Sequence, residues 1–219
     1  MRKNVKETIR KNKKKNKKKN MKKGTFNSKK TSDNVIIREN HYEKYLGEMD
    51  HQILQSGDKS TDVRVEFYKF KPAPKRPGYT LITGGMSDAK QNIPLDNKRT
   101  SGRTELLMYA REPDGWMFGL LDILSLMPFK NKTFLHWQSL YSMGICLHVG
   151  ESEFTHILFM PPFFENECFY NTLHINGDKV DPLWVIPITE LEFQQCQQEN
   201  GALAVMEKIM CDKLPRMFN

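Results

Sequence analysis

The sequence predicts an α/β (α+β) fold in which a mixed central β-sheet is flanked by helices. Residues 183–186, LWVI, form a short apolar run with the length and composition of a strand buried on both faces. Pro187 is expected to end this strand, because proline has no N–H to donate to a sheet. Thr189 and Glu192 then stand in the T-x-x-E spacing of a capping box, which indicates the start of a helix.

The charge divides the chain into two parts. Residues 1–30 hold fifteen Lys or Arg against one acid, a net charge of +14, whereas the remainder holds 19 basic and 25 acidic residues, a net charge of −6. We therefore predict a disordered Lys/Asn-rich tail over residues 1–34, which has too few apolar side chains to offset the entropy of ordering. Residues 35–219 are expected to form a single folded domain.

The tail has two interpretations. A block of like charges is an electrostatic arm suited to nucleic acid, anionic lipid or an acidic partner. It is also the ordinary composition of a solvated low-complexity tail without a function of its own. Met21 offers an alternative start, which removes most of the arm.

The first half of the domain is expected to be a helix followed by strands. Residues 40–55 carry apolar side chains at three- and four-residue steps, which predicts an amphipathic helix whose middle is weakened by Gly47. Strands are expected at residues 63–67 and 79–83, with a polar loop over 84–102 after them. The apolar positions of the helix are Tyr42, Tyr45, Leu46, Met49, Ile53 and Leu54.

The second half repeats the alternation of strand and helix. We expect a strand at residues 103–110, a helix capped by Asp114 and ended by Pro128, and a hairpin over 168–181 that turns at Asn176-Gly177. The core stripe of the middle helix is predicted as Trp116, Leu120, Ile123, Leu124 and Met127. Further strands are expected at residues 145–149 and 155–160, and a last helix after Asn200-Gly201 with Leu203, Met206, Ile209 and Met210 inward.

The candidate partner-binding residues are Gly84, Gly85, Ser87, Asp88 and Glu190. The first four open the longest polar connection between two expected strands, and recognition residues concentrate in ordered loops of this kind. The alternatives are a plain connecting turn in which glycine supplies a positive φ, and a Glu190 that only complements the dipole of its helix. The Gly-Gly pair has neither the G-x-G-x-x-G pattern nor a Walker lysine, so a nucleotide loop is not indicated.

No catalytic or metal-binding pattern stands out, and we expect neither an enzyme nor a cofactor. The sequence has no G-x-S-x-G motif and no serine or cysteine with a base placed beside it by spacing. The spacing of the histidines supports no metal site, because no i, i+2 or i, i+4 pair occurs among His136, His148, His156 and His174. Enzyme therefore remains a minority interpretation.

The four cysteines and the hydropathy indicate a cytoplasmic protein. No C-x-x-C pair occurs among the cysteines, so reduced thiols are expected at Cys146, Cys168, Cys196 and Cys211. No apolar run approaches the ~20 residues of a membrane helix. No apolar h-region follows the basic N-terminus, so secretory export is not expected.

Several stretches in order resemble the suppressor-of-fused (SUFU) domain family in its bacterial single-domain form. The resemblance covers residues 40–212 and ends with GALAVMEKIM at Gly201, in the family's usual place for a terminal helix. The stretches are YTLITGGMSD at 79–88, RTELLMYA at 103–110, LLDILSLMP at 120–128, FTHILFMPP at 154–162 and LWVIPITELEF at 183–193.

The resemblance implies a central sheet flanked by helices and a non-enzymatic, protein-binding role. Animal members of the family hold a transcription factor through a second domain, which a chain of this length lacks. Many bacterial members resemble immunity proteins for polymorphic toxins, often nucleases, so we expect an immunity protein (antitoxin) that masks a cognate toxin. The alternative is a stand-alone interaction module whose basic arm docks on nucleic acid or an anionic membrane.

Overall fold

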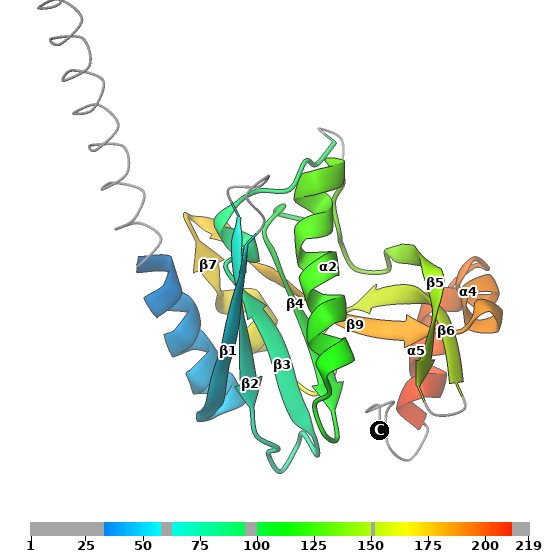
Figure 1. The fold of residues 1–219 in the computed structure, drawn as a ribbon, viewed down its shortest axis with the longest axis horizontal. Helices are drawn as coiled ribbons and strands as arrows, with labels where there is room; N and C mark the ends of the chain where they lie inside the picture. The colour runs from blue at the N-terminus through cyan, green and yellow to red at the C-terminus, as the bar shows by residue number, and fades with distance from the viewer. Residues whose placement is uncertain (1–32, 58–62, 95–99, 150–151, 212–219) are drawn as a thin grey trace, which may run out of the picture.

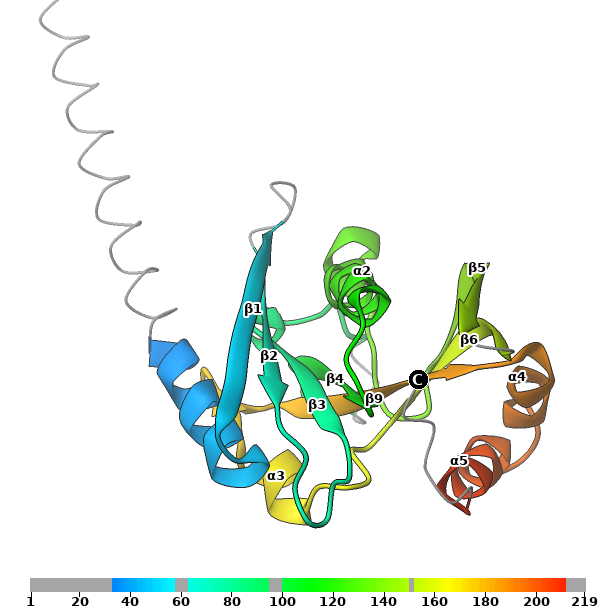
Figure 2. The same cartoon turned by 60° about the horizontal axis from the view of Figure 1, so that its bottom comes forward.

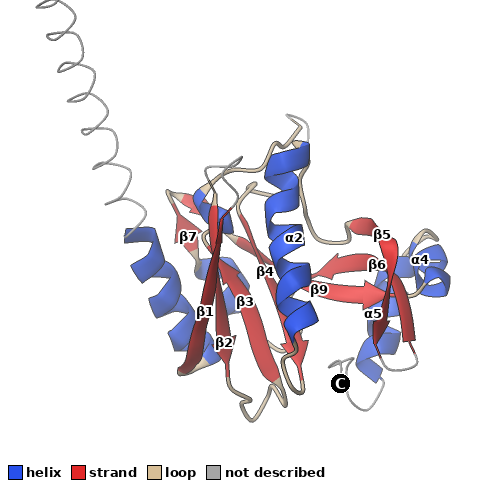
Figure 3. Ribbon diagram, viewed as in Figure 1, coloured by secondary structure: helices blue, strands red, loops and turns tan. Residues whose placement is uncertain are grey.

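The computed structural model describes residues 33–57, 63–94, 100–149 and 152–211. Seven strands form one sheet in the order β1-β2-β3-β4-β9-β6-β5, and all neighbours are antiparallel except the central pair β4 and β9. The strands are β1 (Met49–Gly57), β2 (Arg64–Phe70), β3 (Tyr79–Gly84), β4 (Thr104–Ala110), β5 (Leu140–Val149), β6 (Ser152–Met160) and β9 (Asp181–Ile188). The predicted mixed sheet flanked by helices is confirmed (Figures 1 and 3).

Helices cover both faces of this sheet. The helix over residues 33–46, hereafter the N-terminal helix, lies on one face with α3 (Glu167–Thr172), α4 (Glu190–Cys196) and α5 (Gly201–Cys211). The helix α2 (Gly115–Asn131) packs alone on the other face. Figure 2 shows α2 above the sheet, and α3 and α5 below it. Two cores therefore form, one on each face.

Successive side chains of the strand β4 enter the two cores in alternation. Leu106 and Met108 enter the core beneath α2, while Leu107 and Tyr109 enter the core on the opposite face. This alternation follows from the two-residue period of a strand, and it agrees with the strand predicted at residues 103–110. Glu105 shares the face of Leu107 and is also fully buried.

The central strand β9 is longer than predicted. All eight of its residues are buried, as expected for a strand covered on both faces, but the strand continues through Pro187 to Ile188. At Pro182 the strand pairs only with β4, and at Pro187 it pairs only with β6. Each proline therefore lies where β9 has a single neighbour, the kind of sheet position at which a missing N–H is tolerated.

The N-terminal helix is shifted relative to the prediction. It ends at residue 46, because Gly47 takes a positive φ of 92° and its N–H bonds to the carbonyl of Glu43, which is a glycine C-cap. The chain then enters β1, so residues 49–55 form a strand and not the second half of a helix. Asn34 is buried within this helix, which places the predicted boundary after residue 34 inside the folded body. The remainder of the predicted tail, residues 1–32, lies outside the described residues.

The buried stripe of α2 agrees with the predicted one only in its C-terminal half. Leu124 and Met127 are buried as predicted, whereas Ile123 is 62% exposed. In the first two turns Met117 and Leu121 are fully buried, and the predicted Trp116 and Leu120 are only partly buried. Asp114 caps the helix as expected, but Pro128 does not end it and lies in the last turn before a left-handed Lys132. A proline there disturbs only the end of the helical hydrogen-bond ladder.

Two local signals in the C-terminal part are confirmed. Asn176 and Gly177 both have positive φ, and they turn the short hairpin of β7 (His174–Ile175) and β8 (Asp178–Lys179). The residues before it are helical, because Asn166 caps α3 by accepting from the N–H of Phe169. Helix α5 begins at Gly201 as predicted, but Leu203 is exposed and Val205 takes its place in the core.

Candidate functional site

The five predicted binding residues lie in two separate places. Gly84 ends β3, Gly85 and Asp88 bound the short 3₁₀ helix η1 (Met86–Asp88), and Glu190 begins α4. In the sheet β3 is separated from β6 by β4 and β9, and α4 packs on β6. Figure 1 accordingly shows β3 and α4 on different sides of the molecule. The structure therefore does not bring Glu190 together with the turn at residues 84–88.

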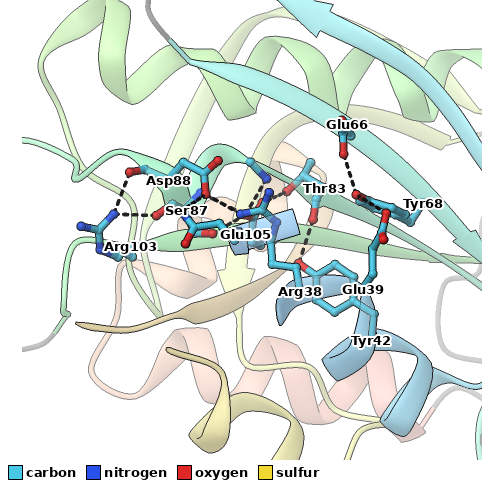
Figure 4. A network of polar contacts seen from close by, with 12 residues as sticks. Arg38, Glu39, Tyr42, Glu66, Tyr68, Thr83, Ser87, Asp88, Arg103 and Glu105 are labelled. Atoms are coloured by element: carbon cyan, nitrogen blue, oxygen red, sulfur yellow. Dashed lines mark hydrogen bonds and ion pairs between the residues drawn. The ribbon is translucent and has the colours of Figure 1, made fainter. Parts of the chain in front are cut away.

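The turn at residues 84–88 is organised by the buried carboxylate of Glu105 (Figure 4). One oxygen, Oε1, accepts from the backbone N–H of Gly85 at 3.0 Å, the N–H of Ser87 at 2.9 Å and the Ser87 hydroxyl at 2.6 Å. The other oxygen accepts from the Thr83 hydroxyl at 2.7 Å. Four donors satisfy this carboxylate, as a charge without access to water requires.

Arg38 joins the N-terminal helix to this turn. Its side chain is 1% exposed, and its guanidinium donates to the Asp88 carboxylate, to which Asn34 also donates at 3.0 Å. One turn further along the helix, the hydroxyl of Tyr42 donates to the carbonyl of Thr83 at 2.9 Å. Three side chains of one helix therefore hold the turn in place.

Arg103 extends the same network to the β7–β8 hairpin. Its Nη1 donates to the carbonyls of Ser87 and Asp88, at 2.7 and 2.9 Å. Its Nε donates to Asp178 at 2.9 Å. Ser87 is thus bound by its carbonyl and its amide, and Asp88 by its carbonyl and its carboxylate, so the network fixes the turn from both sides.

The charges of the network shift one another's pKa. Burial raises the pKa of Glu105, although Arg38 and the hydrogen bonds from Ser87 and Thr83 oppose that shift. Burial also disfavours the charge on Arg38, but the carboxylates of Glu105 and Asp88 outweigh it and raise its pKa. Arg38 therefore stays charged, and it is the cation that compensates two acids.

Glycine is required at the turn for space as well as for conformation. Gly85 has a φ of 102°, and a Cβ there would lie 2.2 Å from the carbonyl oxygen of Arg64. A Cβ on Gly84 would lie 2.5 Å from the ring of Tyr68. The interpretation of Gly85 as a turn residue with positive φ is confirmed, and the close approach to β2 explains why the chain needs two glycines in succession.

Ser87 and Glu105 have the separation of a nucleophile and its base, but the pair is enclosed. Both residues are fully buried, and Oε1 of Glu105 is shared with two backbone amides. A substrate cannot reach Ser87 while the turn is closed, and the hydrogen bonds stabilise the fold instead. The turn therefore offers no outer surface at Gly84, Gly85 and Ser87, and Asp88 is half-buried beside the fully buried Arg38.

Glu190 lies in a different environment at the first turn of α4. Its side chain is half exposed, accepts from Gln194 at 3.1 Å and lies 3.6 Å from Nδ1 of His156. The neighbouring Leu191 is 75% exposed. Thr189 and Glu192 form the predicted capping box, with Thr189 accepting from the N–H of Glu192 at 3.3 Å and Glu192 accepting from the N–H of Thr189 at 2.9 Å. Helix α4 therefore presents an acid and a leucine from a fixed helix start.

The described part of the chain brings no group of potential metal ligands together at one place. Among the described residues no three His, Cys, Asp or Glu side chains lie close enough together to hold a metal ion. Cys146, Cys168 and Cys196 are free thiols, and burial raises the pKa of Cys196 to about 11. No helix within the described part of the chain combines the length and apolar character needed to cross a membrane.

The partners that hold the turn, Arg38, Arg103 and Glu105, were not identified from the sequence. Arg38 and Asp88 are 50 positions apart, and Glu105 stands in a segment that was predicted only as a strand. The available signal was a glutamate on the buried face of an apolar strand, which requires a hydrogen-bonded or charged partner elsewhere.

The comparisons with known proteins agree on one family. The family model described as "Suppressor of fused protein (SUFU)" matches residues 61–216. The fold is similar to the crystal structure of a SUFU (suppressor of fused protein) homologue from Neisseria gonorrhoeae FA 1090, with a TM-score of 0.58 and 14% identity over 82% of this chain and 89% of that one. No curated protein matches the chain significantly.

Proposed function

Because the chain belongs to the suppressor of fused (SUFU) family, we propose that it is a non-enzymatic, cytoplasmic protein-binding domain that acts as an immunity protein for a cognate toxin. The observation that carries this proposal is the acidic and apolar surface of α4. Glu190 and the 75% exposed Leu191 stand side by side on a helix whose start is fixed by its capping box. An exposed leucine with acidic neighbours on a rigid element suits contact with a basic protein.

The electrostatics favour a partner that binds nucleic acid. A toxin nuclease presents cations to phosphates, and carboxylates on an inhibitor occupy the same surface and accelerate association. The segment that continues from α4 into α5 adds two exposed acids, Glu199 and Glu207. Lys208, next to Glu207 in the sequence, is a cation near them. The remainder of the chain after residue 30 carries a net charge of −6, which has the same sign.

The absence of catalysis is part of this proposal. Within the described residues, Glu105 and Glu165 are the carboxyl groups whose pKa is raised, in both cases by burial. Glu105 is enclosed by its four donors, and Glu165 is paired with Arg76 at 3.3 Å. A perturbed carboxyl that contacts only its own fold stabilises structure and does not transfer protons to a substrate.

The test of this function is rescue together with binding kinetics. The reading frame next to this gene should encode a protein that is toxic when expressed alone, and co-expression of this chain should restore growth. The Glu190→Lys substitution should then lower the association rate with that protein by about tenfold at low salt and less at high salt. The matched control is Glu48→Lys, which makes the same charge change at an exposed position remote from α4 along the chain.

Two results would contradict the proposal. Failure of the chain to neutralise its neighbour would remove the immunity function. Equal association rates for Glu190→Lys and Glu48→Lys, with both variants folded by circular dichroism, would place the contact surface away from α4. Asp88→Lys is unsuitable for this test, because Asp88 is the partner of Arg38 and Asn34.

A second candidate function rests on the basic arm. The fifteen Lys or Arg among residues 1–30 favour a module that docks on nucleic acid or an anionic membrane while the body recruits a partner. Removal of residues 1–30 should then abolish salt-dependent binding to polyanions and leave the thermal midpoint within about 2 °C. Unchanged binding of the truncated chain would contradict this function.

A further inference from the structure

The outermost strand β5 carries an apolar bulge. It pairs with β6 through its first three and its last three residues, but the register shifts between these two stretches. The four residues between them, 143–146, therefore lie opposite a single residue of β6, Thr155. Gly144 bends the backbone here with a φ of 67°, and Ile145 is 67% exposed. Bulges on an edge strand redirect side chains, and this one directs an isoleucine into solvent. We call residues 143–146 the β5 bulge.

The β5 bulge lies close to the start of α4. Thr155, the residue of β6 opposite the bulge, is followed by His156, whose ring stacks on that of Phe193 in α4 with a centroid distance of 3.8 Å. The Nδ1 of His156 also lies 3.6 Å from the carboxylate of Glu190. Figure 1 shows β5, β6 and α4 grouped at one side of the molecule. A series of contacts therefore leads from the bulge, across one strand, to the α4 surface.

These two segments carry the two most exposed large hydrophobic side chains of the described residues. Leu191 in α4 is 75% exposed, and Ile145 in the β5 bulge is 67% exposed. A single apolar side chain on a surface needs no explanation. Two of them on adjoining elements, with polar groups around them, are typical of a surface that contacts another protein.

The charge around these side chains has one sign. The elements β5, β6 and α4 contain no Lys or Arg, and they carry the exposed carboxylates of Glu153 and Glu190. Glu153 lies 3.8 Å from Nδ1 of His148, but the two side chains are 71% and 66% exposed. Water therefore screens this pair and leaves the carboxylate open to another cation. Apolar side chains with acids beside them suit a partner whose surface is basic.

A second copy of this chain fits the surface less well than a basic protein does. A two-fold contact would place Glu153 and Glu190 against the same acidic surface of the other copy, and like charges across an interface oppose association. The bulge also interrupts the open edge of β5, which obstructs pairing with a strand of another molecule. Contacts through side chains with a basic protein are therefore favoured.

We propose that the β5 bulge and the start of α4 form one contact surface for a basic protein. Ile145 and Leu191 enter apolar pockets of this partner. Glu153 and Glu190 pair with lysines or arginines beside those pockets. The inference rests on the proposed function, which places the partner on α4, and it extends the contact to the edge of the sheet.

The test is to measure binding of the full chain to the purified product of the neighbouring reading frame by biolayer interferometry. Ile145→Ala should raise the dissociation rate about tenfold, because the complex loses the apolar area of the isoleucine. The matched control is Ile123→Ala, which removes an isoleucine of 62% exposure from α2, on the opposite face of the sheet from α4, and should not change the rate. Glu153→Gln should lower the association rate about threefold at low salt and less at high salt.

The outcomes separate this inference from the proposed function. Faster dissociation of Ile145→Ala but not of Ile123→Ala, with both thermal midpoints within about 2 °C of wild type, supports the joint surface. Wild-type kinetics of Ile145→Ala together with slow association of Glu190→Lys overturns the part played by the β5 bulge and leaves the contact at α4 intact. Absence of binding to the neighbouring product overturns both. A dimer of this chain that Ile145→Ala converts to a monomer in analytical ultracentrifugation overturns the basic partner in favour of a second copy.

Discussion

The turn at residues 84–88 and the start of α4 are both polar segments that follow a buried strand, yet they are stabilised differently. At α4, Thr189 and Glu192 satisfy the helix N-terminus with two side chains three residues apart. At the turn, the donors of Gly85 and Ser87 are satisfied by Glu105, which is 18 to 20 residues away, and the segment is locked by Arg38 from another helix. A local cap leaves the outer face of its helix open, whereas a long-range network buries the segment that it holds.

This difference decides which segment is available for binding. Glu190 and Leu191 remain exposed because the cap uses only Thr189 and Glu192. Gly84, Gly85 and Ser87 are inaccessible because the turn is itself the ligand of Glu105. A polar loop between two strands is therefore not sufficient evidence of a recognition surface, because a buried charge behind the loop can bind its polar atoms within the fold.

The largest expected effect is at β9, which leads into α4 and pairs with β4, the strand that carries Glu105. Trp184 in β9 is 1% exposed and packs edge-on against Tyr109 with a centroid distance of 5.3 Å. Trp184→Ala should reduce the free energy of unfolding by about 3–5 kcal/mol, because the cavity cannot be filled by its rigid neighbours. Urea denaturation measures this value. A loss below about 1 kcal/mol would contradict the placement of Trp184 in the core.

The second prediction removes the cation of the network. Arg38→Met keeps the length of the side chain but leaves two acids without their partner, and it should cost about 3–5 kcal/mol by analogy with other broken buried pairs. The matched variant at the other region is Glu190→Gln, which should cost less than about 0.5 kcal/mol. Equal effects of the two variants in thermal unfolding would remove the distinction between the regions.

The third prediction concerns pH. The folded-state pKa of Glu105 is raised by burial, so the native protein binds this proton more tightly than the unfolded chain. The stabilisation from this group is greatest below its ordinary pKa of 4.5 and is lost as the pH rises through the folded-state value. The difference in unfolding free energy between wild type and Glu105→Gln should therefore decrease from pH 4.5 upward. A difference that grows with pH in urea titrations would refute the raised pKa.

A smaller loss of stability than at Trp184 or Arg38 is expected at the cap. Thr189→Ala removes the hydroxyl that accepts from Glu192 and should cost about 1 kcal/mol. Thr189→Ser keeps an acceptor and should restore most of this loss. Chemical denaturation distinguishes these values. If alanine and serine destabilise equally, the capping box does not contribute as described.

The sequence was informative wherever a signal is local. Three features that depend on a few adjacent residues are confirmed. They are the capping box at Thr189, the turn at Asn176-Gly177 and the start of α5 at Gly201. The buried strand at residues 183–186 is confirmed for the same reason, because its apolar run is continuous. The predictions for Glu190 and Asp88 as partner contacts remain predictions.

The errors occur where tertiary contacts override the local pattern. Residues 49–55 have a helical apolar period but become β1, because Gly47 ends the helix and β2 offers an edge for pairing. The start of the N-terminal helix was missed because its inward residues, Asn34 and Arg38, are polar and are buried against Asp88. A search for apolar residues at helical spacing does not detect a helix whose inward side chains are held by a buried ion pair.

The most direct test of the contrast between the two regions is amide hydrogen exchange followed residue by residue. The N–H groups of Gly85 and Ser87 donate to a fully buried carboxylate, so they should exchange only with global unfolding, as slowly as the amides of β4 and β9. In Arg38→Met their protection should fall, while that of α4 should remain unchanged. Exchange of Gly85 and Ser87 within seconds in the wild-type chain would show that the turn is open in solution, and the account of a sealed network would be wrong.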